Sequence, residues 1–357
     1  MAPRNSSIID FVETAYDLSL AHSEWLPRLI DAGTSVLDRG CGVFAITGTR
    51  PAIPGPISVE RIYIASGPPD LAARMARMQS EVDMAVFWSL SRAGVPRTLS
   101  EMLWERDPAT FRRIMHHFDF AKDAVGISAR EPGGRAVYII IPLPSVTSLT
   151  PRSREVWQML SSHFDAGYRL RRGLEPGQAR AVPALPHGAE ALIEPTHFRV
   201  TEAQGAAKSR SALEALRDAA KRVDRARGRM RDTEPERALE LWRALVRGRW
   251  STVDWFDSDG RRFVLGVPNA LPVSDPRGLS EREYQAVAYA AAGETNKMIG
   301  YHLGLSKGRV SCLLSSAMRK LQVENRAQLV QRFRDFSRGV SDLEGPPMRR
   351  PDGSSDR

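Results

Sequence analysis

The C-terminal architecture follows from a segment that reads Leu279-Ser-Glu-Arg-Glu-Tyr-Gln-Ala-Val-Ala-Tyr-Ala-Ala-Ala-Gly293. Ser280 and Glu283 are spaced as a capping box, in which the hydroxyl accepts from the Glu283 amide and the carboxylate reaches back to the start of the helix. The Ala-rich helix that begins there should end at Gly293, because glycine adopts the left-handed conformation that stops a helix.

Two further helices are expected directly after this one. The first contains Ile299 and Leu303 four residues apart on one face, and Gly304 ends it. Ser306 caps the second, whose apolar stripe at helical spacing consists of Val310, Leu314, Ala317 and Leu321. Two helices joined by three residues that include a glycine form a helix-turn-helix, whose second helix can lie in the major groove of DNA.

The segment resembles the LuxR-type (NarL-like) DNA-binding domain, a four-helix unit at the C-terminus of bacterial transcription regulators. The resemblance rests on Leu279, Ser280, Arg282, Glu283, Gly293, Asn296, Lys297, Ile299, Leu303, Ser306, Val310, Arg319, Lys320, Leu321, Asn325 and Arg326. It implies an all-α helix-turn-helix domain over residues 277–337 that binds double-stranded DNA. It also implies that the last helix helps to form a homodimer, through Leu329, Val330 and Phe333, although these residues could also pack only inward.

The resemblance places the DNA contacts on the second and third helices and on the start of the fourth. The residues expected to bind DNA are Asn296, Lys297, Ser306, Lys307, Arg309, Ser311, Cys312, Ser315, Arg319, Lys320 and Arg326. A dimer is also expected because one helix-turn-helix unit buries little surface on DNA, and two half-sites multiply its affinity.

The recognition helix departs from the family pattern where bases are read. The family usually has Thr-Val-Lys and then His two residues later, whereas this chain has Arg309-Val-Ser311 and Leu313, with Ser315 at the later basic position. Serine discriminates less among bases than a bidentate Arg or Asn, and Gly308 weakens the first turn by about 1 kcal/mol relative to Ala. The remaining basic residues still attract phosphates. Two alternatives therefore stay open: a domain that reads specific DNA sequences, and a partner-binding module that has lost this readout.

Length, charge and cysteine usage limit what the rest of the chain can be. With 357 residues it should hold two or three domains, and its net charge of +9 favours an anionic partner, nucleic acid above all. Two distant cysteines, Cys41 and Cys312, exclude a disulfide scaffold and a Cys-based zinc finger, and fit a reducing cytoplasm. The start carries no secretory signal and the longest apolar run, 136–143, is too short to span a bilayer, so we expect a cytoplasmic protein without membrane contact.

Residues 1–175 are expected to form an α+β domain with an antiparallel sheet. Apolar spacing predicts helices at 7–18 and 25–37, strands at 40–46 and 59–65, helices at 69–78 and 82–90, a hairpin of 124–130 and 135–141 around the turn 131–134, and a helix from Thr150-Pro151 to about Leu174. This order of elements resembles that of GAF and PAS sensor domains. The resemblance implies a sensory region that can take a small-molecule effector, and the sequence identifies no cofactor.

A second, small α+β (PAS-like) module is expected over residues 189–270, either independent or part of a larger domain. It follows a linker at 175–188 and contains strands at 189–194 and 197–202, helices at 208–231 and 234–247, and a hairpin of 252–257 and 262–267. The stripe of the helix 211–230, formed by Leu213, Leu216, Ala220, Val223 and Met230 with a polar position at Arg227, suits either a coiled coil between protomers or a helix lying on its own sheet. Residues 269–278 should be a hinge and 339–357 a disordered tail.

No constellation of residues predicts catalysis or metal binding. A Ser-His-Asp arrangement, a Gly-rich phosphate loop and a metal-ligand spacing are all missing from the sequence, which argues against an enzyme. His116 and His117 point about 100° apart on a helix, so we interpret them as ordinary histidines, and Cys41 as a small buried residue. We therefore predict a DNA-binding transcriptional regulator whose sensory and dimerising N-terminal region controls the helix-turn-helix. The alternative is an interaction or adaptor protein whose helix-turn-helix has lost specific readout.

Overall fold

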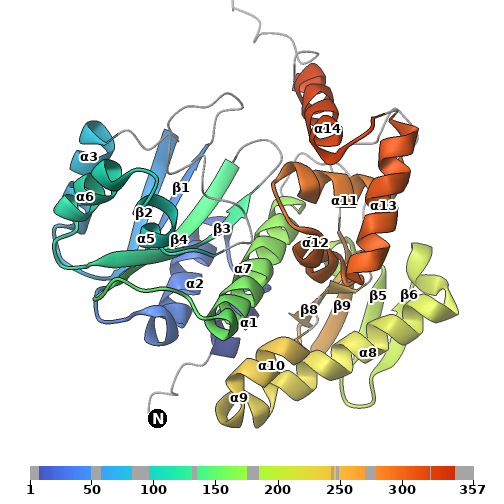
Figure 1. Ribbon diagram of the computed structural model, residues 1–357. Helices are drawn as coiled ribbons and strands as arrows, with labels where there is room; N and C mark the ends of the chain where they lie inside the picture. Colours follow the sequence, from blue (N-terminus) through green and yellow to red (C-terminus); the bar gives the residue numbers. More distant parts are fainter. Residues whose placement is uncertain are drawn as a thin grey trace, which may run out of the picture.

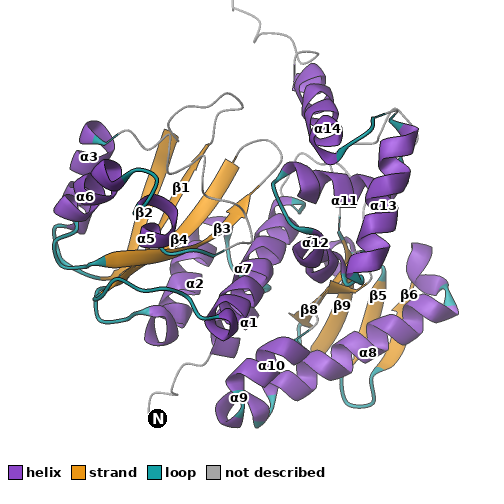
Figure 2. Ribbon diagram, viewed as in Figure 1, coloured by secondary structure: helices purple, strands orange, loops and turns teal. Residues whose placement is uncertain are grey.

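The computed structural model describes residues 8–49, 58–82, 96–130, 135–174, 185–242, 245–246, 249–269, 279–321 and 323–341. Within these ranges the chain forms two antiparallel sheets with their helices and a C-terminal group of helices (Figures 1 and 2). The mixed α+β class expected from the sequence is confirmed. The turn 131–134 lies outside the described residues. So do most of the predicted helix 82–90, most of the linker 175–188 and most of the hinge 269–278.

The first sheet has four strands in the order β2-β1-β4-β3, all antiparallel. Its strands are β1 (Val43–Thr49), β2 (Ser58–Ser66), β3 (Asp123–Arg130) and β4 (Arg135–Leu143). The predicted hairpin is the β3–β4 pair, in which Ile127 faces Ile139. β1 begins later than expected, because Gly40 and Gly42 take φ values of 89° and 98° that do not belong to a strand.

Helices cover both faces of this sheet, as the alternation of side chains along its strands requires. One face packs Val43 and Ala45 against α1 (Ile8–Ala15), α2 (His22–Leu37) and α7 (Pro151–Arg172). The other packs Phe44 and Ile46 against α3 (Leu71–Glu81), α5 (Leu99–Leu103) and α6 (Pro108–His117). The strand β1 is therefore buried on both sides, which explains its continuous apolar run.

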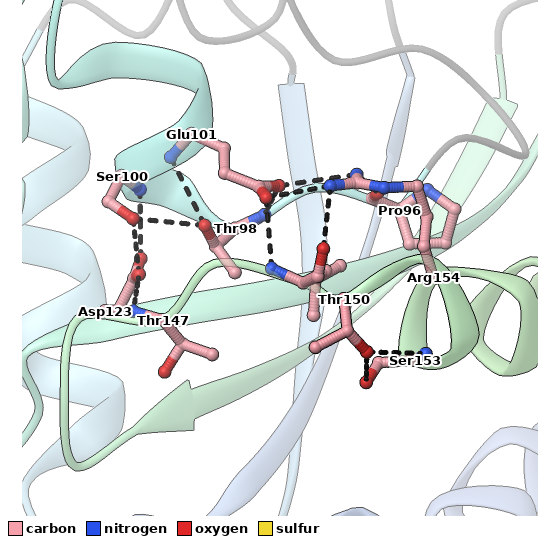
Figure 3. A network of polar contacts seen from close by, with 10 residues as sticks. Pro96, Thr98, Ser100, Glu101, Asp123, Thr147, Thr150, Ser153 and Arg154 are labelled. Atoms are coloured by element: carbon pink, nitrogen blue, oxygen red, sulfur yellow. Dashed lines mark hydrogen bonds and ion pairs between the residues drawn. The ribbon is translucent and has the colours of Figure 1, made fainter.

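A polar network joins α5, β3 and the segment before α7 (Figure 3). The Asp123 carboxylate, which is fully buried, accepts from the Ser100 amide (2.9 Å), the Ser100 hydroxyl (2.6 Å) and the Thr147 amide (3.0 Å). Beside it Glu101 accepts from Arg154 (2.8 Å) and from the Leu149 amide (3.1 Å). These carboxylates supply acceptors to backbone groups that helix and sheet leave without partners.

Replacing Asp123 by alanine should lower the free energy of unfolding by about 3–5 kcal/mol, because buried backbone donors would lose their acceptor. Asp119→Ala is the matched control, since Asp119 is 69% exposed and pairs with Arg74 at the surface; such exposed pairs contribute little. Urea unfolding followed by circular dichroism measures both. Equal midpoints for the two variants would contradict the structural role of Asp123.

The second sheet has five strands in the order β6-β5-β9-β8-β7. They are β5 (Ala191–Glu194), β6 (Arg199–Ala203), β7 (Leu245–Val246), β8 (Trp250–Phe256) and β9 (Arg262–Pro268), accompanied by η1 (Pro186–Gly188) and η2 (Gly205–Lys208). The helix α8 (Arg210–Arg227) lies on this sheet, with Leu216 and Ala220 packed in one cluster with Ile193 and Val264. The apolar stripe of α8 suited either a coiled coil between protomers or a helix lying on its own sheet, and in the structure the helix lies on its own sheet.

Both helices predicted for this region are shorter than expected. The first ends at Arg227, and Gly228 separates it from the short α9 (Met230–Thr233). The second, α10 (Pro235–Leu241), ends six residues before the predicted Arg247, because Trp242 is extended (ψ 97°) and buried. Val246 then pairs with Trp250 in the sheet, so strand pairing and burial of an aromatic side chain prevail over local helix propensity.

Charge pairs connect the second sheet and its helices to the first domain. Arg227, the polar position in the stripe of α8, binds Glu13 of α1 (2.6 Å) and Asp254 of β8 (2.5 Å). Arg231 pairs with Asp10, and Arg152 of α7 pairs with Glu236 and Glu240 of α10 (2.6 and 3.0 Å). The polar position at 227 is therefore a contact between the two parts of the chain.

The C-terminal group consists of α11 (Glu281–Ala291), α12 (Asn296–Leu303), α13 (Lys307–Lys320) and α14 (Arg326–Ser341). The residues predicted to begin and end these helices are confirmed. Ser280 and Glu283 form the capping box, Gly293 and Gly304 have φ of 92° and 64°, and Ser306 caps α13. α14 continues to Ser341, so the prediction that residues 339–341 belong to a disordered tail is wrong; the rest of that tail lies outside the described residues. In the described part of the chain, no helix combines the length and apolar content needed to cross a membrane.

Candidate nucleic-acid interface

The helix α13 presents a polar face to solvent and an apolar face to its own domain. Val310, Leu314 and Ala317 are buried in the core of the four helices, and so is Leu313, which replaces a basic residue of the family pattern. On the other face the exposed side chains are Lys307, Arg309, Ser311, Cys312, Ser315 and Arg319. The helix predicted to contact DNA therefore has its expected contact residues turned outward.

The first turn of α13 is well formed despite its glycine. Ser306 accepts from the Arg309 amide at 3.2 Å and so caps the helix. A side chain at Gly308 would point into open space, since no atom lies within 4 Å of its Cβ position. The two cations of this turn, Lys307 and Arg309, are exposed next to the backbone amides of the helix N-terminus, which attract phosphate.

Other residues predicted to bind DNA already have partners inside the domain. Arg326 donates to Asn296 Oδ1 (2.5 Å) and to the carbonyl oxygen of Glu294. Lys320 lies 2.7 Å from a carboxylate oxygen of Glu283. These contacts hold the helices together, and a role for Asn296, Lys320 and Arg326 in DNA binding stays a prediction.

The Glu283 carboxylate also stabilises the folded domain in a pH-dependent way. Burial raises its pKa, but hydrogen bonds from Lys320 and Ser316 outweigh that effect and lower the pKa from 4.5 to about 2. Because the folded pKa lies below the unfolded one, this stabilisation is complete above the unfolded value and is lost as the pH falls from there towards 2. At neutral pH the capping box and the Lys320 contact are both in place.

The helix α14 uses its predicted dimer residues within the domain. Leu329 is fully buried and Phe333 is 5% exposed, with its ring centroid 5.1 Å from that of Tyr284. Val330 is half-buried against the same core. Dimerisation through α14 stays a prediction, but Leu329 and Phe333 are core residues, so a dimer contact would need a different face of the helix.

A buried histidine joins the C-terminal helices to the first domain. Nδ1 of His163 in α7 lies 3.2 Å from the phenol oxygen of Tyr16, and Nε2 lies 3.2 Å from that of Tyr301 in α12. Burial lowers the pKa of His163 from 6.5 to about 3, and the nearby His302 adds to this effect. The neutral ring has one donor and one acceptor, so it can satisfy both phenols at once.

A charged pair on the next turns of α7 packs against α11. Arg169 lies 2.8 Å from Asp165, and its guanidinium stacks over the Tyr289 ring at 4.4 Å. Burial disfavours the charge of Arg169, yet the Asp165 carboxylate keeps its pKa raised, whereas burial raises the pKa of Tyr289 to about 12. At neutral pH the interface therefore holds a buried cation on a neutral phenol, a cation–π contact.

Further buried polar groups lie just inside this contact. The His302 ring stacks on Tyr289 with centroids 4.7 Å apart, and its Nε2 is 3.7 Å from a Glu294 carboxylate oxygen. Among the described residues neither His302 nitrogen nor the second Glu294 oxygen has a hydrogen-bond partner, although both side chains are at most 1% exposed. Such groups cost free energy to bury.

The docked arrangement also occupies the N-terminus of α12. Lys297, which is expected to contact a DNA phosphate, lies 3.9 Å from the Glu155 carboxylate of α7. α12 contacts both α7 and β7, and Figure 1 shows it between α7 and the second sheet. We call the contact formed by Glu155, His163, Asp165 and Arg169 of α7 with Tyr289, Lys297 and Tyr301 the α7 dock.

The α7 dock was not predicted from the sequence. His163 was one histidine on an amphipathic helix, and its two tyrosine partners lie 147 and 138 residues away along the chain. A cue was present in the spacing of polar side chains at Glu155, His163, Asp165 and Arg169 in a helix otherwise rich in buried residues.

The other candidate residues have ordinary surroundings. His117 pairs with the exposed Glu81 at 3.3 Å, and its ring centroid lies 5.8 Å from that of His116. Cys41 is buried, and its Sγ donates to the Phe120 carbonyl oxygen at 3.4 Å. In the part of the chain that the structure describes, no group of three or more His, Cys, Asp or Glu residues is arranged to hold a metal ion.

Comparison with known proteins bears on the C-terminal segment. Residues 277–333 match the family described as bacterial regulatory proteins, luxR family. The Escherichia coli (strain K12) protein YhjB, described as an HTH-type transcriptional regulator, is 43% identical over 72 residues, which are 19% of this chain and 36% of that protein. A crystal structure of Escherichia coli SdiA aligns with 88% of this chain and 90% of its own, at 11% identity and with a TM-score of 0.31.

Proposed function

We propose that this chain, whose residues 277–333 match the luxR family of bacterial regulatory proteins, is a transcriptional regulator that binds double-stranded DNA. The observation that carries the proposal is the outward polar face of α13, with Lys307 and Arg309 exposed in its first turn. In a helix-turn-helix the second helix enters the major groove and its N-terminal residues contact base edges. Lys307 and Arg309 then supply phosphate attraction, and Arg309 with Ser311 and Ser315 supplies readout.

The regions before residue 270 act as the control element in this proposal. The four-stranded sheet with helices on both faces is the sensory domain, GAF- or PAS-like in its order of elements, and it binds a small-molecule effector. The five-stranded sheet with α8 connects it to the DNA-binding domain. A protein that controls transcription in this way acts in the cytoplasm as a homodimer, because two linked units bind two half-sites far more tightly than one.

The α7 dock supports a mechanism for that control. The first helix of a helix-turn-helix crosses the DNA backbone, but α12 is held against α7 and β7, with Glu155 beside Lys297. A phosphate approaching Lys297 would meet the Glu155 carboxylate. The docked arrangement is thus the DNA-free state, and an effector acts by shifting the population towards released DNA-binding units.

Retardation of DNA fragments by the purified full-length protein tests the proposal. We expect binding at low salt, including to DNA from the region upstream of its own gene, and a steep loss of affinity as salt is raised, because phosphate contacts release counterions. Failure to retard any promoter fragment at low salt would contradict the proposal. An excess of non-specific DNA distinguishes specific from general binding.

The double variant Ser311→Lys/Ser315→Lys separates a working regulator from an adaptor without specific readout. Both positions are exposed on α13, so the domain should fold normally. For a working regulator we expect an altered or weakened preference among operator sequences, measured by selection from a random DNA pool. A large gain of specific binding where the unchanged protein has none would instead favour the adaptor.

A further inference from the structure

A cavity of about 490 Å³ opens on the first sheet, between the start of α2 and the end of α7. Its floor is a row that crosses three strands, since Thr47 of β1 pairs with Arg61 of β2 on one side and with Val137 of β4 on the other. Cavities of about 300–1,000 Å³ are the usual size for small-molecule sites. The cavity is separate from α13 and from the α7 dock.

Aromatic and apolar side chains line the inner part of this cavity. Trp25 and Leu26 of α2 and Tyr168 of α7 contribute, all at most 6% exposed, and Tyr63 of β2 adds a half-buried phenol. The Trp25 indole nitrogen already donates to the Thr14 carbonyl oxygen at 3.0 Å. The inner wall is therefore apolar. Because Trp25 stacks on Phe164 and Tyr168 with ring centroids 6.1 and 6.2 Å apart, it offers ring edges and aliphatic carbon to a ligand rather than open ring faces.

Three guanidinium groups and one carboxylate surround the opening. Arg61 and Arg135 are exposed, Arg172 is half-buried, and Glu60 accepts from the Thr49 hydroxyl at 2.9 Å. The opening therefore has an excess of positive charge. Guanidinium groups match carboxylates in geometry and donate charge-assisted hydrogen bonds to them.

We propose that this cavity is the effector site and that its ligand is a small organic acid with an aromatic or aliphatic body and a carboxylate group. The apolar body lies on Trp25, Val137 and Tyr168, and the carboxylate binds Arg61 and Arg135. That the ligand acts as an effector rests on the function proposed above, whereas binding of the ligand does not depend on that function.

The helix α7 connects this cavity to the DNA-binding domain. Tyr168 and Arg172 form the cavity wall on the last turns of α7, and Asp165 and Arg169 of the same turns belong to the α7 dock. A ligand that shifts Tyr168 and Arg172 therefore also moves Arg169, whose guanidinium stacks on Tyr289. This gives the effector a direct physical route to the docked domain.

Isothermal titration of the full-length protein with 1-naphthoate, benzoate and octanoate tests the site. We expect saturable binding of at least one acid, and at least 10-fold weaker binding of the corresponding amide, which keeps the apolar body and lacks the charge. Arg61→Gln and Arg135→Gln should each weaken binding of that acid about 10-fold, the loss expected for a charge-assisted hydrogen bond.

Arg199→Gln is the matched control, because Arg199 is an exposed arginine on β6 of the other sheet; it should leave binding unchanged. Unchanged melting temperatures confirm that the exposed arginines are not needed for folding. The proposal is overturned if none of the three acids binds saturably at millimolar concentration, if the amide binds as tightly as the acid, or if Arg199→Gln weakens binding as much as the cavity variants.

This titration contains no DNA, so its outcome and that of the DNA retardation experiment are independent. An acid that binds to a protein without DNA affinity would support the site and contradict the regulator. A protein that binds DNA and none of the acids would do the reverse.

Discussion

The double substitution Lys307→Glu/Arg309→Glu should weaken binding to double-stranded DNA by at least about 100-fold near 0.1 M salt, because two phosphate-attracting cations become anions. Both side chains are exposed in the first turn of α13, and neither lies in the core of the domain. The affinity should also become less dependent on salt, with the slope of log K against log salt smaller by about 2. Fluorescence anisotropy of labelled DNA at several salt concentrations measures both quantities.

A charge reversal far from α13 serves as the control for position. Arg210→Glu reverses a cation whose side chain is 93% exposed at the start of α8, outside the C-terminal helices. It should reduce affinity only slightly, because exposed charges farther than about 10 Å from the DNA are largely screened at this salt concentration. If Arg210→Glu weakened binding as much as the α13 variant, α13 would not be the DNA contact.

Tyr301→Glu should raise the affinity for DNA about 10-fold or more. Tyr301 is half-buried and bonds to the neutral His163 of α7, and a carboxylate at 301 would enter a region that already holds Asp165 and Glu294. Burying an unpaired charge there is costly, so the variant should favour the released domain, in which residue 301 faces water. If about a tenth or less of the unchanged protein is in the released, binding-competent state, a variant that is fully released binds DNA about 10-fold or more tightly.

Tyr301→Phe is the graded control for this prediction. It keeps the ring in the α7 dock and removes the hydrogen bond to His163, so its effect should have the same sign and be smaller than that of Tyr301→Glu. Small-angle scattering of the free protein should show a more extended particle for the Glu variant. DNA affinity that falls, or stays the same while the particle extends, would show that the α7 dock does not restrain DNA binding.

The C-terminal domain could be predicted almost completely from the sequence. Ser280, Glu283, Gly293, Gly304 and Ser306 mark the ends of its helices through contacts within a few residues, and such local signals can be read from the chain directly. The outward face of α13 followed from the same apolar spacing. The strand pairs β3–β4 and β8–β9 were also found, because a short turn between two strands is another local signal.

Predictions failed where distant residues decide the outcome. The helix expected to reach Arg247 stops at Leu241, because Trp242 is buried and Val246 pairs in a sheet. Leu329 and Phe333 pack within the group of C-terminal helices, and their role at a dimer contact stays a prediction. For the shortened helix the local pattern was compatible with both outcomes, and packing against other elements selected one.

The sequence by itself determined that residues 296–320 form a helix-turn-helix with basic residues in the first turn of its second helix, since its capping residues and apolar stripe act within a few turns of helix. Only the tertiary structure decided that α12 lies against α7, that His163 bridges Tyr16 and Tyr301, and that a cavity with arginines at its opening lies at the other side of α7. These features join residues more than a hundred positions apart. No local periodicity encodes such contacts, because they depend on how complete elements pack and which buried polar groups then meet.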